Sequence, residues 1–171
     1  IMELYAQKLN DGLNNLIQKN IQCSSKTALV NMLQKGNAKY LFIINDKRTY
    51  GERVGQYKAI LEKGVEQDVN IIYNINDNQN LHVYDLLERK EIPVKSKEDG
   101  LEFKVSLPAA GGKIVAILPE TIDRVEVKSI KKILRKQKTN IQIAIMNKKG
   151  LLVPAVIPIQ LEIKDPQGNI S

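Results

Sequence analysis

The sequence predicts a mainly β protein: an antiparallel β-sandwich, with one α-helix before it and part of a second β-sandwich after it. Three observations indicate this class. Short segments rich in Val, Ile, Leu and Tyr recur at intervals of roughly 8 to 12 residues. Turn-forming residues such as Asn, Asp and Gly separate these segments. Several segments alternate apolar and polar side chains, as strands with one buried and one wet face do.

Residues 1–22 predict an N-terminal helix segment, with the helix itself over 2–20. Apolar side chains recur there at spacings of three and four residues and would form one stripe along the helix. Gly12 weakens the helix by about 1 kcal/mol relative to alanine. We expect the stripe to cover an apolar surface or to continue from a preceding domain. The stripe consists of Tyr5, Leu9, Leu13, Leu16 and Ile17.

Residues 23–127 predict the main sandwich. The expected strands lie at 26–34, 38–46, 65–75, 80–86, 90–96, 101–107 and 112–119. The last of these is apolar on both faces and should be a central strand. Residues 47–63 are ambiguous, since two glycines and several basic residues suggest a long loop with one helical turn or a short strand. The expected core residues are Leu41, Ile43, Val69, Ile71, Val83, Phe103, Val105, Val115 and Ile117.

Residues 128–171 predict the start of a second β domain that is truncated here. After a basic segment come a strand, an Asn-Lys-Lys-Gly turn and a long strand. Pro154 and Pro158 cannot donate to a β ladder, so the long strand should be an edge or be bulged at those points. A lone hairpin is marginal in water, so this part should pack on the first domain or on a neighbouring chain. Both ends look cut, which suggests a fragment of a longer protein.

Composition excludes several classes of function. Hydrophobic residues make up 43% of the chain, enough for an aliphatic core and against global disorder. One cysteine, Cys23, excludes a disulfide framework or a cysteine-based zinc site within this chain, and one histidine excludes His-rich metal sites. No apolar run reaches the roughly 18 residues of a membrane span. No cofactor is predicted. The net charge of +7 would attract anionic surfaces weakly without identifying a partner.

The stretch "HVYDLLERKEIPV", residues 82–94, is the best candidate for acid–base chemistry. It places the only histidine, His82, close to Asp85, Glu88 and Glu91. On a strand, however, His82 and Asp85 point to opposite faces. No motif supplies a nucleophile beside the histidine. We therefore expect a hairpin with Glu88 in its turn, and no catalytic residues.

Carboxylates elsewhere are the other route to hydrolysis. Glycosidases need two carboxylates facing across a cleft, and Asp68, Asp77, Asp99 and Glu102 could supply them. Their positions in turns and on outward strand faces favour surface charge instead. The Asn-rich segment 74–80 could also bind calcium near Asp77. It does not meet the EF-hand pattern and is typical of a turn.

The basic segment is the alternative functional site. It could bind phosphates or an anionic glycan. It lacks the interleaved aromatic side chains that stack on bases, so nucleic acid is not an expected partner. A solvated interdomain segment is the competing interpretation. The candidate anion-binding residues are Lys128, Lys131, Lys132, Arg135, Lys136 and Lys138.

Two family resemblances follow from the strand pattern. The series "YLFIIND", "VNIIYNI", "HVYDLLERKEIPV", "LEFKVSL" and "GKIVAILP", within residues 27–118, resembles the β-sandwich that follows the catalytic barrel in many glycoside hydrolases, including β-galactosidases with a C-terminal all-β domain. The stretch "NKKGLLVPAVIPIQLEIKDPQGN", within residues 139–171, resembles the start of immunoglobulin-like domains of large bacterial surface or secreted proteins. In both families such modules are non-catalytic and support, space or orient their neighbours.

These resemblances imply an accessory or structural module of a larger exported, carbohydrate-active protein, in an extracellular or periplasmic location. The implied partners are neighbouring domains of that protein. The alternative is a binding module for an anionic glycan or surface through residues 128–138. No catalytic residue, metal ligand or cofactor site is implied.

Overall fold

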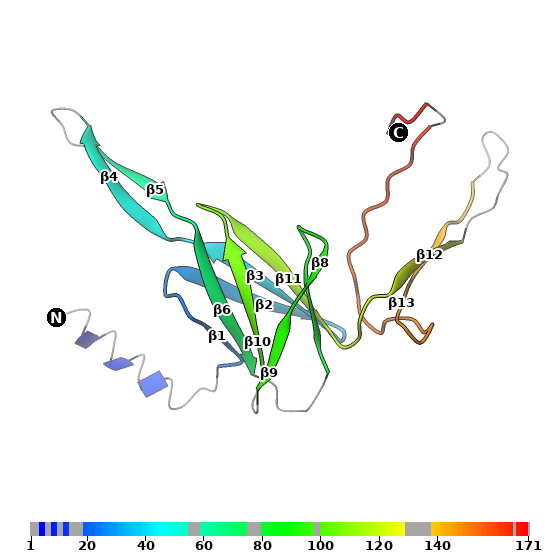
Figure 1. Ribbon diagram of the computed structural model, residues 1–171, viewed down its shortest axis with the longest axis horizontal. Coiled ribbons are helices and arrows are strands. Elements are labelled where there is room, and N and C mark those ends of the chain that lie inside the picture. Colours follow the sequence, from blue (N-terminus) through cyan, green and yellow to red (C-terminus); the bar gives the residue numbers. More distant parts are fainter. Residues whose placement is uncertain are drawn as a thin grey trace.

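Two antiparallel sheets face each other across an aliphatic core in the computed structural model of this chain (Figure 1). The predicted mainly β class with antiparallel sheets is confirmed. The structure describes residues 4–5, 8–9, 12–13, 19–54, 59–74, 80–97, 100–128, 138–165 and 167–170, with the backbone alone for 50–54 and 59–62.

The first sheet contains four strands. In spatial order they are β1 (Ile21–Cys23), β6 (Gln67–Asn74), β10 (Gly100–Leu107) and β9 (Val94–Lys97). The two central strands, β6 and β10, pair along their full length, so that Phe103 lies opposite Ile71 and Val105 opposite Val69. These apolar cross-strand pairs line the inner face of the sheet, because residues opposite one another in an antiparallel ladder share a face.

The second sheet contains five strands. In spatial order they are β2 (Ala28–Lys35), β3 (Ala38–Asn45), β11 (Gly112–Leu118), β7 (His82–Asp85) and β8 (Lys90–Ile92). The prediction of a central strand at 112–119 is confirmed, since β11 pairs with β3 on one side and with β7 on the other. The expected turn between β2 and β3 contains Gly36 at a φ of 58°. Glycine adopts this left-handed conformation without a steric penalty.

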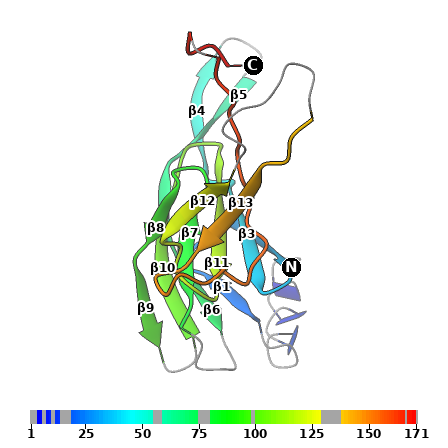
Figure 2. The same ribbon diagram turned by 90° about the vertical axis from the view of Figure 1, so that its right-hand side faces the viewer.

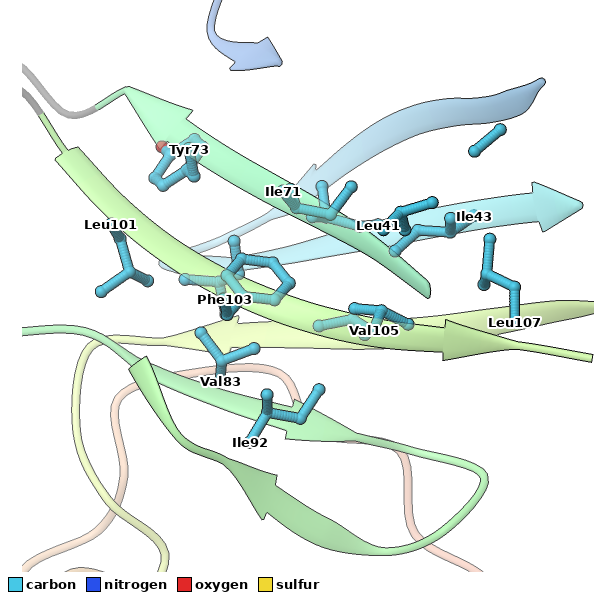
Figure 3. Close-up of a cluster of buried hydrophobic side chains, with 14 of the residues drawn as sticks. Leu41, Ile43, Ile71, Tyr73, Val83, Ile92, Leu101, Phe103, Val105 and Leu107 are labelled. Atoms are coloured by element: carbon cyan, nitrogen blue, oxygen red, sulfur yellow. The ribbon is translucent and has the colours of Figure 1, made fainter. Parts of the chain in front are cut away.

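The core lies between the inner faces of the two sheets (Figure 3). All the core residues predicted from the sequence are buried, none with more than 3% of its surface exposed. Fully burying one such Val, Leu, Ile or Phe side chain is worth about 1.5–3 kcal/mol relative to leaving it exposed. The burial of both inner faces is therefore the main term that holds the two sheets together.

Asn45 closes one end of the sandwich. Its side chain is buried, and its Nδ2 donates to the carbonyl oxygens of Val65 at 2.9 Å and Pro108 at 2.7 Å. Its Oδ1 accepts from the backbone N–H of Lys47 at 3.0 Å and from Gln67 Nε2 at 2.7 Å. A buried amide that is paired in this way costs little to bury. It joins the end of β3 to the beginning of β6 and to the turn between β10 and β11.

Two hairpins lie outside the main sheets. β4 (Arg48–Val54) pairs with β5 (Ala59–Gly64) and projects beyond the sandwich (Figure 1). The long loop expected at 47–63 is therefore wrong over the described residues, whereas the short strand given as its alternative corresponds to β5. The partner strand supplies backbone hydrogen bonds that no single-segment pattern can show. β12 (Arg124–Lys128) pairs with β13 (Gln142–Met146), on the side of the five-stranded sheet (Figure 2).

The N-terminal helix is not confirmed. Helical backbone is described only at residues 4–5, 8–9 and 12–13, and most of the predicted helix over 2–20 lies outside the described residues. The described apolar side chains Leu4, Tyr5, Leu9 and Leu13 are all exposed. Most helical stability in proteins comes from packing of an apolar face. These exposed side chains therefore do not contribute such packing.

Prolines correct two strand predictions. The predicted strand 90–96 is two strands, because Pro93 ends β8 and the chain crosses to the other sheet as β9. The predicted long strand around Pro154 and Pro158 does not form: between residues 151 and 163 the structure describes a single isolated bridge, at Leu152 to Met146. Proline has no N–H to donate, which prevents a continuous ladder at each of these points.

Candidate functional site

The predicted acid–base cluster is divided between the two faces of its sheet. His82 points outward and its Nδ1 lies 2.9 Å from Glu91 Oε1, on the neighbouring strand β8. Asp85 points inward and only 4% of its side chain is exposed, whereas 24% of His82 is exposed. The predicted separation of His82 from Asp85 is confirmed. The carboxylate partner of His82 is therefore a surface residue, and the pair does not occupy a deep pocket.

Asp85 belongs to a buried ion pair that the sequence did not reveal. Lys113 of β11 points into the same end of the core and places its Nζ 2.6 Å from Asp85 Oδ2. The other oxygen of Asp85 accepts 2.9 Å hydrogen bonds from the backbone N–H groups of Leu87 and Glu88. Asp85 thereby fixes the β7–β8 turn, in which Glu88 lies as predicted.

Glu88 completes this cluster from the turn. Its carboxylate accepts a hydrogen bond from Lys113 and pairs with Lys90. These contacts, that to Lys113 foremost, lower the pKa of Glu88 from 4.5 to about 2. Burial opposes the charged form of Lys113, but hydrogen bonds with Asp85 and Glu88 outweigh it and raise the pKa of the lysine. Lys113 therefore stays charged and is held between two carboxylates.

A groove of about 540 Å³, lined mainly by polar or charged residues, lies beside the cluster at the end of the sandwich. Most of the polar groups in its lining are already paired within the protein. Asp68 pairs with Lys104 at 2.6 Å and accepts from Ser106 Oγ at 2.6 Å, while Glu88 pairs with Lys113. The lining residues are Glu66, Gln67, Asp68, Glu88, Ser106, Leu107, Pro108 and Lys113. Asp68 and Glu88 are therefore both engaged in ion pairs at this end of the sandwich.

The remaining sequence candidates are not brought together. Glu102 pairs with Lys97 at 2.9 Å across strands β10 and β9. Asp77 and Asp99 lie outside the described residues, so calcium binding near Asp77 stays a hypothesis. Cys23 packs against the core cluster as a free thiol. Within the described part of the chain, no group of three or more His, Cys, Asp or Glu residues could hold a metal ion.

The basic segment is described only at its ends. Lys128 at the end of β12 and Lys138 are both exposed. The other candidate anion-binding residues, Lys131, Lys132, Arg135 and Lys136, lie outside the described residues. Anion binding by this segment stays a prediction.

The outer face of the five-stranded sheet contacts a segment that is distant in the sequence. Here the segment 155–157 packs across strands β3, β11 and β7 and forms a second apolar cluster, which we call the outer seam. Ala38, Ala116 and Leu118 are buried beneath it, at no more than 2% exposure each. The partly buried members are Tyr40, Tyr84, Leu86, Ile122, Ala155 and Ile157.

Two tyrosines anchor the outer seam with their hydroxyl groups. Tyr40 donates to the carbonyl oxygen of Val156, and burial raises the pKa of its phenol. The Tyr84 hydroxyl accepts from the backbone N–H of Ile122 at 2.9 Å and lies 3.2 Å from Thr121 Oγ1. A tyrosine that is apolar along its ring and hydrogen-bonded at its tip suits a contact between a sheet and a segment that crosses it.

The outer seam also connects to the β12–β13 hairpin. The Val153 N–H donates to Ile145 of β13 at 2.9 Å, two residues before Ala155 enters the seam. Asn147, which is buried, accepts from the N–H groups of Lys149 and Leu151 and donates to Glu120. The hairpin is therefore linked, at the end where Arg124 pairs with Met146, to the segment before it through Glu120 and to the segment after it through Val153. Figures 1 and 2 both show the β12–β13 hairpin and the segment after it on the side of the five-stranded sheet.

The sequence pattern contained one signal for the seam. Strand 38–45 is apolar on both faces, which predicts a strand covered on both sides. The inward residues Leu41 and Ile43 belong to the predicted core, whereas the outward Ala38 and Tyr40 contact the outer seam, which was not predicted from the sequence. Within the described part of the chain, no helix has the length and apolar character that crossing a membrane requires.

Comparison with known proteins adds a partial likeness in fold. No model of a known protein family matches the chain, and no curated protein matches it. Among solved structures, the chain is similar to alpha-L-fucosidase isoenzyme 2 from Paenibacillus thiaminolyticus, with 13% identity and a TM-score of 0.47. The match covers 64% of this chain and 17% of the length of that structure. At this level of similarity, neither the family nor the activity of that enzyme extends to this chain.

Proposed function

We propose that this chain is a non-catalytic accessory module that holds neighbouring parts of a larger protein in a fixed orientation. The observation that supports this most directly is the outer seam, in which a segment following a separate hairpin packs along the sandwich. Buried Ala116 and Leu118 and the hydroxyl of Tyr40 resist sliding or rotation of that segment. A connection of this kind transmits the orientation of the sandwich to whatever follows it.

Several observations favour a structural role over catalysis. The only histidine is paired with a surface glutamate and is separated from Asp85. The buried lysine, Lys113, is held by two carboxylates, so it is charged and not poised as a nucleophile. The described candidates for acid–base chemistry, His82, Asp68, Asp85, Glu88 and Glu102, each form an ion pair within the protein.

The nature of the larger protein rests on the sequence resemblance of residues 27–118 to the sandwiches of glycoside hydrolases. On that basis the parent protein is proposed to be carbohydrate-active and exported, with an extracellular or periplasmic location. The second part, residues 128–171, is proposed to be the start of an immunoglobulin-like domain. Its two-stranded hairpin exposes Val125 and Val127, which further strands of such a domain would cover.

A distance measurement between spin labels tests the fixed orientation. One label is placed at Ser96 on β9 and one at Lys149 in the turn that follows β13, both exposed, with Cys23→Ala as background. We expect a narrow distance distribution, because the outer seam prevents independent motion of the hairpin. Ile157→Asp places a charge on the apolar seam and should broaden the distribution.

Ile159→Asp is the matched control, because this side chain is 50% exposed and does not belong to the outer seam. It should leave the distribution narrow. A broad distribution in the unsubstituted background would contradict the proposal, since the two parts would then move independently. Circular dichroism of each variant checks that the sandwich is still folded.

A further inference from the structure

The outer strands of the two main sheets differ in how they are protected against pairing with strands of other chains. Natural sheets keep their edges short, charged or interrupted by proline, because an open edge pairs with other chains. β1 is three residues long, β8 is three residues long and is followed by Pro93, and β9 exposes Lys95 and Lys97. Each of these edges carries one of the known protections.

β2 carries none of these protections along most of its length. It has eight residues, contains no proline and has its one charge at the last position, Lys35. Among the described strands its ladder partner is β3, so its other side is a sheet edge. Two of its outward side chains are large, apolar and exposed, with 57% of Leu29 and 55% of Leu33 open to solvent. A long edge strand with no charge over its first seven residues is a ready template for pairing with another chain.

The sequence of β2 is self-complementary about Asn31. If two antiparallel copies of β2 are centred on this residue, Leu29 of each copy lies opposite Leu33 of the other. On the inner face, Val30 lies opposite Met32, and both side chains already contact the core cluster. Asn31 lies opposite its own copy and can form an amide–amide hydrogen bond there. Each cross-strand pair is thus a favourable one.

We propose that β2 pairs antiparallel with β2 of a second copy of this chain, on a two-fold axis at Asn31. The pairing joins the two five-stranded sheets into one continuous sheet. It satisfies the open backbone groups of β2 and buries the flanks of Leu29 and Leu33. A symmetric contact of this type closes on itself and gives a dimer, not a fibre. This inference is independent of the proposed function.

Molar mass as a function of concentration tests the dimer. Light scattering after gel filtration should show a rise from 19.3 kDa towards twice that mass as concentration increases. Asn31→Lys places a like charge directly opposite itself on the axis and should raise the dissociation constant by at least about tenfold. Asn31 is exposed, so the fold should be kept.

Ser96→Lys is the matched control for this measurement. It adds the same charge on the outer strand of the other sheet, at an exposed position. It should leave the dissociation constant unchanged. A mass of one chain at every concentration would overturn the proposal, as would an equal effect of the two lysine substitutions.

Cysteine cross-linking tests the register. In a Cys23→Ala background, Asn31→Cys should form a disulfide-linked dimer, because directly opposed residues lie within the Cα separation that a disulfide needs. Leu29→Cys alone should not cross-link, since its copy lies about 14 Å away along the ladder. A mixture of Leu29→Cys and Leu33→Cys chains should cross-link. Efficient cross-linking of Leu29→Cys with itself would rule out the axis at Asn31.

Discussion

Asp85 shows how a single residue takes a role that its neighbours in sequence do not reveal. Strand alternation places Asp85 on the inner face of its sheet, where an unpaired carboxylate would be costly. The compensation comes from Lys113, 28 residues later, and from two backbone N–H groups of the turn. An ion pair at this depth contributes less to net stability than its short distance suggests, because both charges lose water. Its clearest effect is to fix the β7–β8 turn against β11.

The neighbouring Glu88 gives the cluster a defined pH dependence. Its pKa in the folded protein is about 2, below the ordinary value of 4.5, mainly through its hydrogen bonds with Lys113 and Lys90. The unfolded chain therefore binds the proton more tightly. The stabilisation from this group is present above about pH 4.5 and is lost as the pH falls towards 2.

Urea unfolding at a series of pH values through this window should show a smaller loss of unfolding free energy for Glu88→Gln than for the unsubstituted chain. Glu66→Gln is the matched control, since it removes another carboxylate from the same groove without removing a partner of Lys113. If Glu88→Gln and the unsubstituted chain lose stability in parallel, the ion pair with Lys113 does not exist in solution.

At the scale of strands, alternation and turn residues located most of the sandwich. The predicted segments at 26–34, 38–46 and 101–107 correspond to β2, β3 and β10 within one or two residues at each end. The errors occur where pairing depends on a distant partner or on a missing N–H. Pro93 divided one predicted strand between two sheets. The pairing of β4 with β5 formed a hairpin from a segment that had no clear period.

The close approach of β10 to β6 explains the glycine at the beginning of β10. A Cβ on Gly100 would lie 2.3 Å from the carbonyl oxygen of Tyr73, a backbone atom that cannot move aside without shifting the strand. Gly100→Ala should therefore lower the unfolding free energy by about 1–3 kcal/mol, as overpacking commonly does. Chemical denaturation measures this directly.

Gly12→Ala is the matched control for this substitution. A Cβ there meets nothing within 4 Å, so the change should be neutral or slightly stabilising. Equal stability of Gly100→Ala and the unsubstituted chain would show that β10 is farther from β6 in solution than the pairing register implies.

At the scale of the whole molecule, the net charge of +7 raises the question of anion binding. We expect retention on a heparin column to follow net charge alone. Replacing Lys131, Lys132 and Lys136 with alanine lowers the charge from +7 to 7 − 3 = +4. The same reduction at the dispersed residues Lys26, Lys35 and Lys95 is the matched control. The two variants should elute at the same salt concentration.

A much earlier elution of the first variant than of the second would contradict this expectation. It would identify the segment 128–138 as a local anion site, because clustered cations contribute more to the salt dependence than dispersed ones when they contact one polyanion. The two variants have the same net charge, so a difference in their elution would favour the glycan-binding alternative and equal elution would favour the accessory role.

The sequence by itself determined the β class, the residues of the sandwich core, the turn at Gly36 and the opposite faces of His82 and Asp85. These features follow from periodicity and from turn chemistry, which act over a few neighbouring residues. Only the tertiary structure decided that Lys113 meets Asp85 and Glu88, that Tyr40 contacts Val156, and that β2 is the outermost of the described strands in its sheet. Those contacts depend on which strands become neighbours, and that choice is made by burying two whole sheet faces at once.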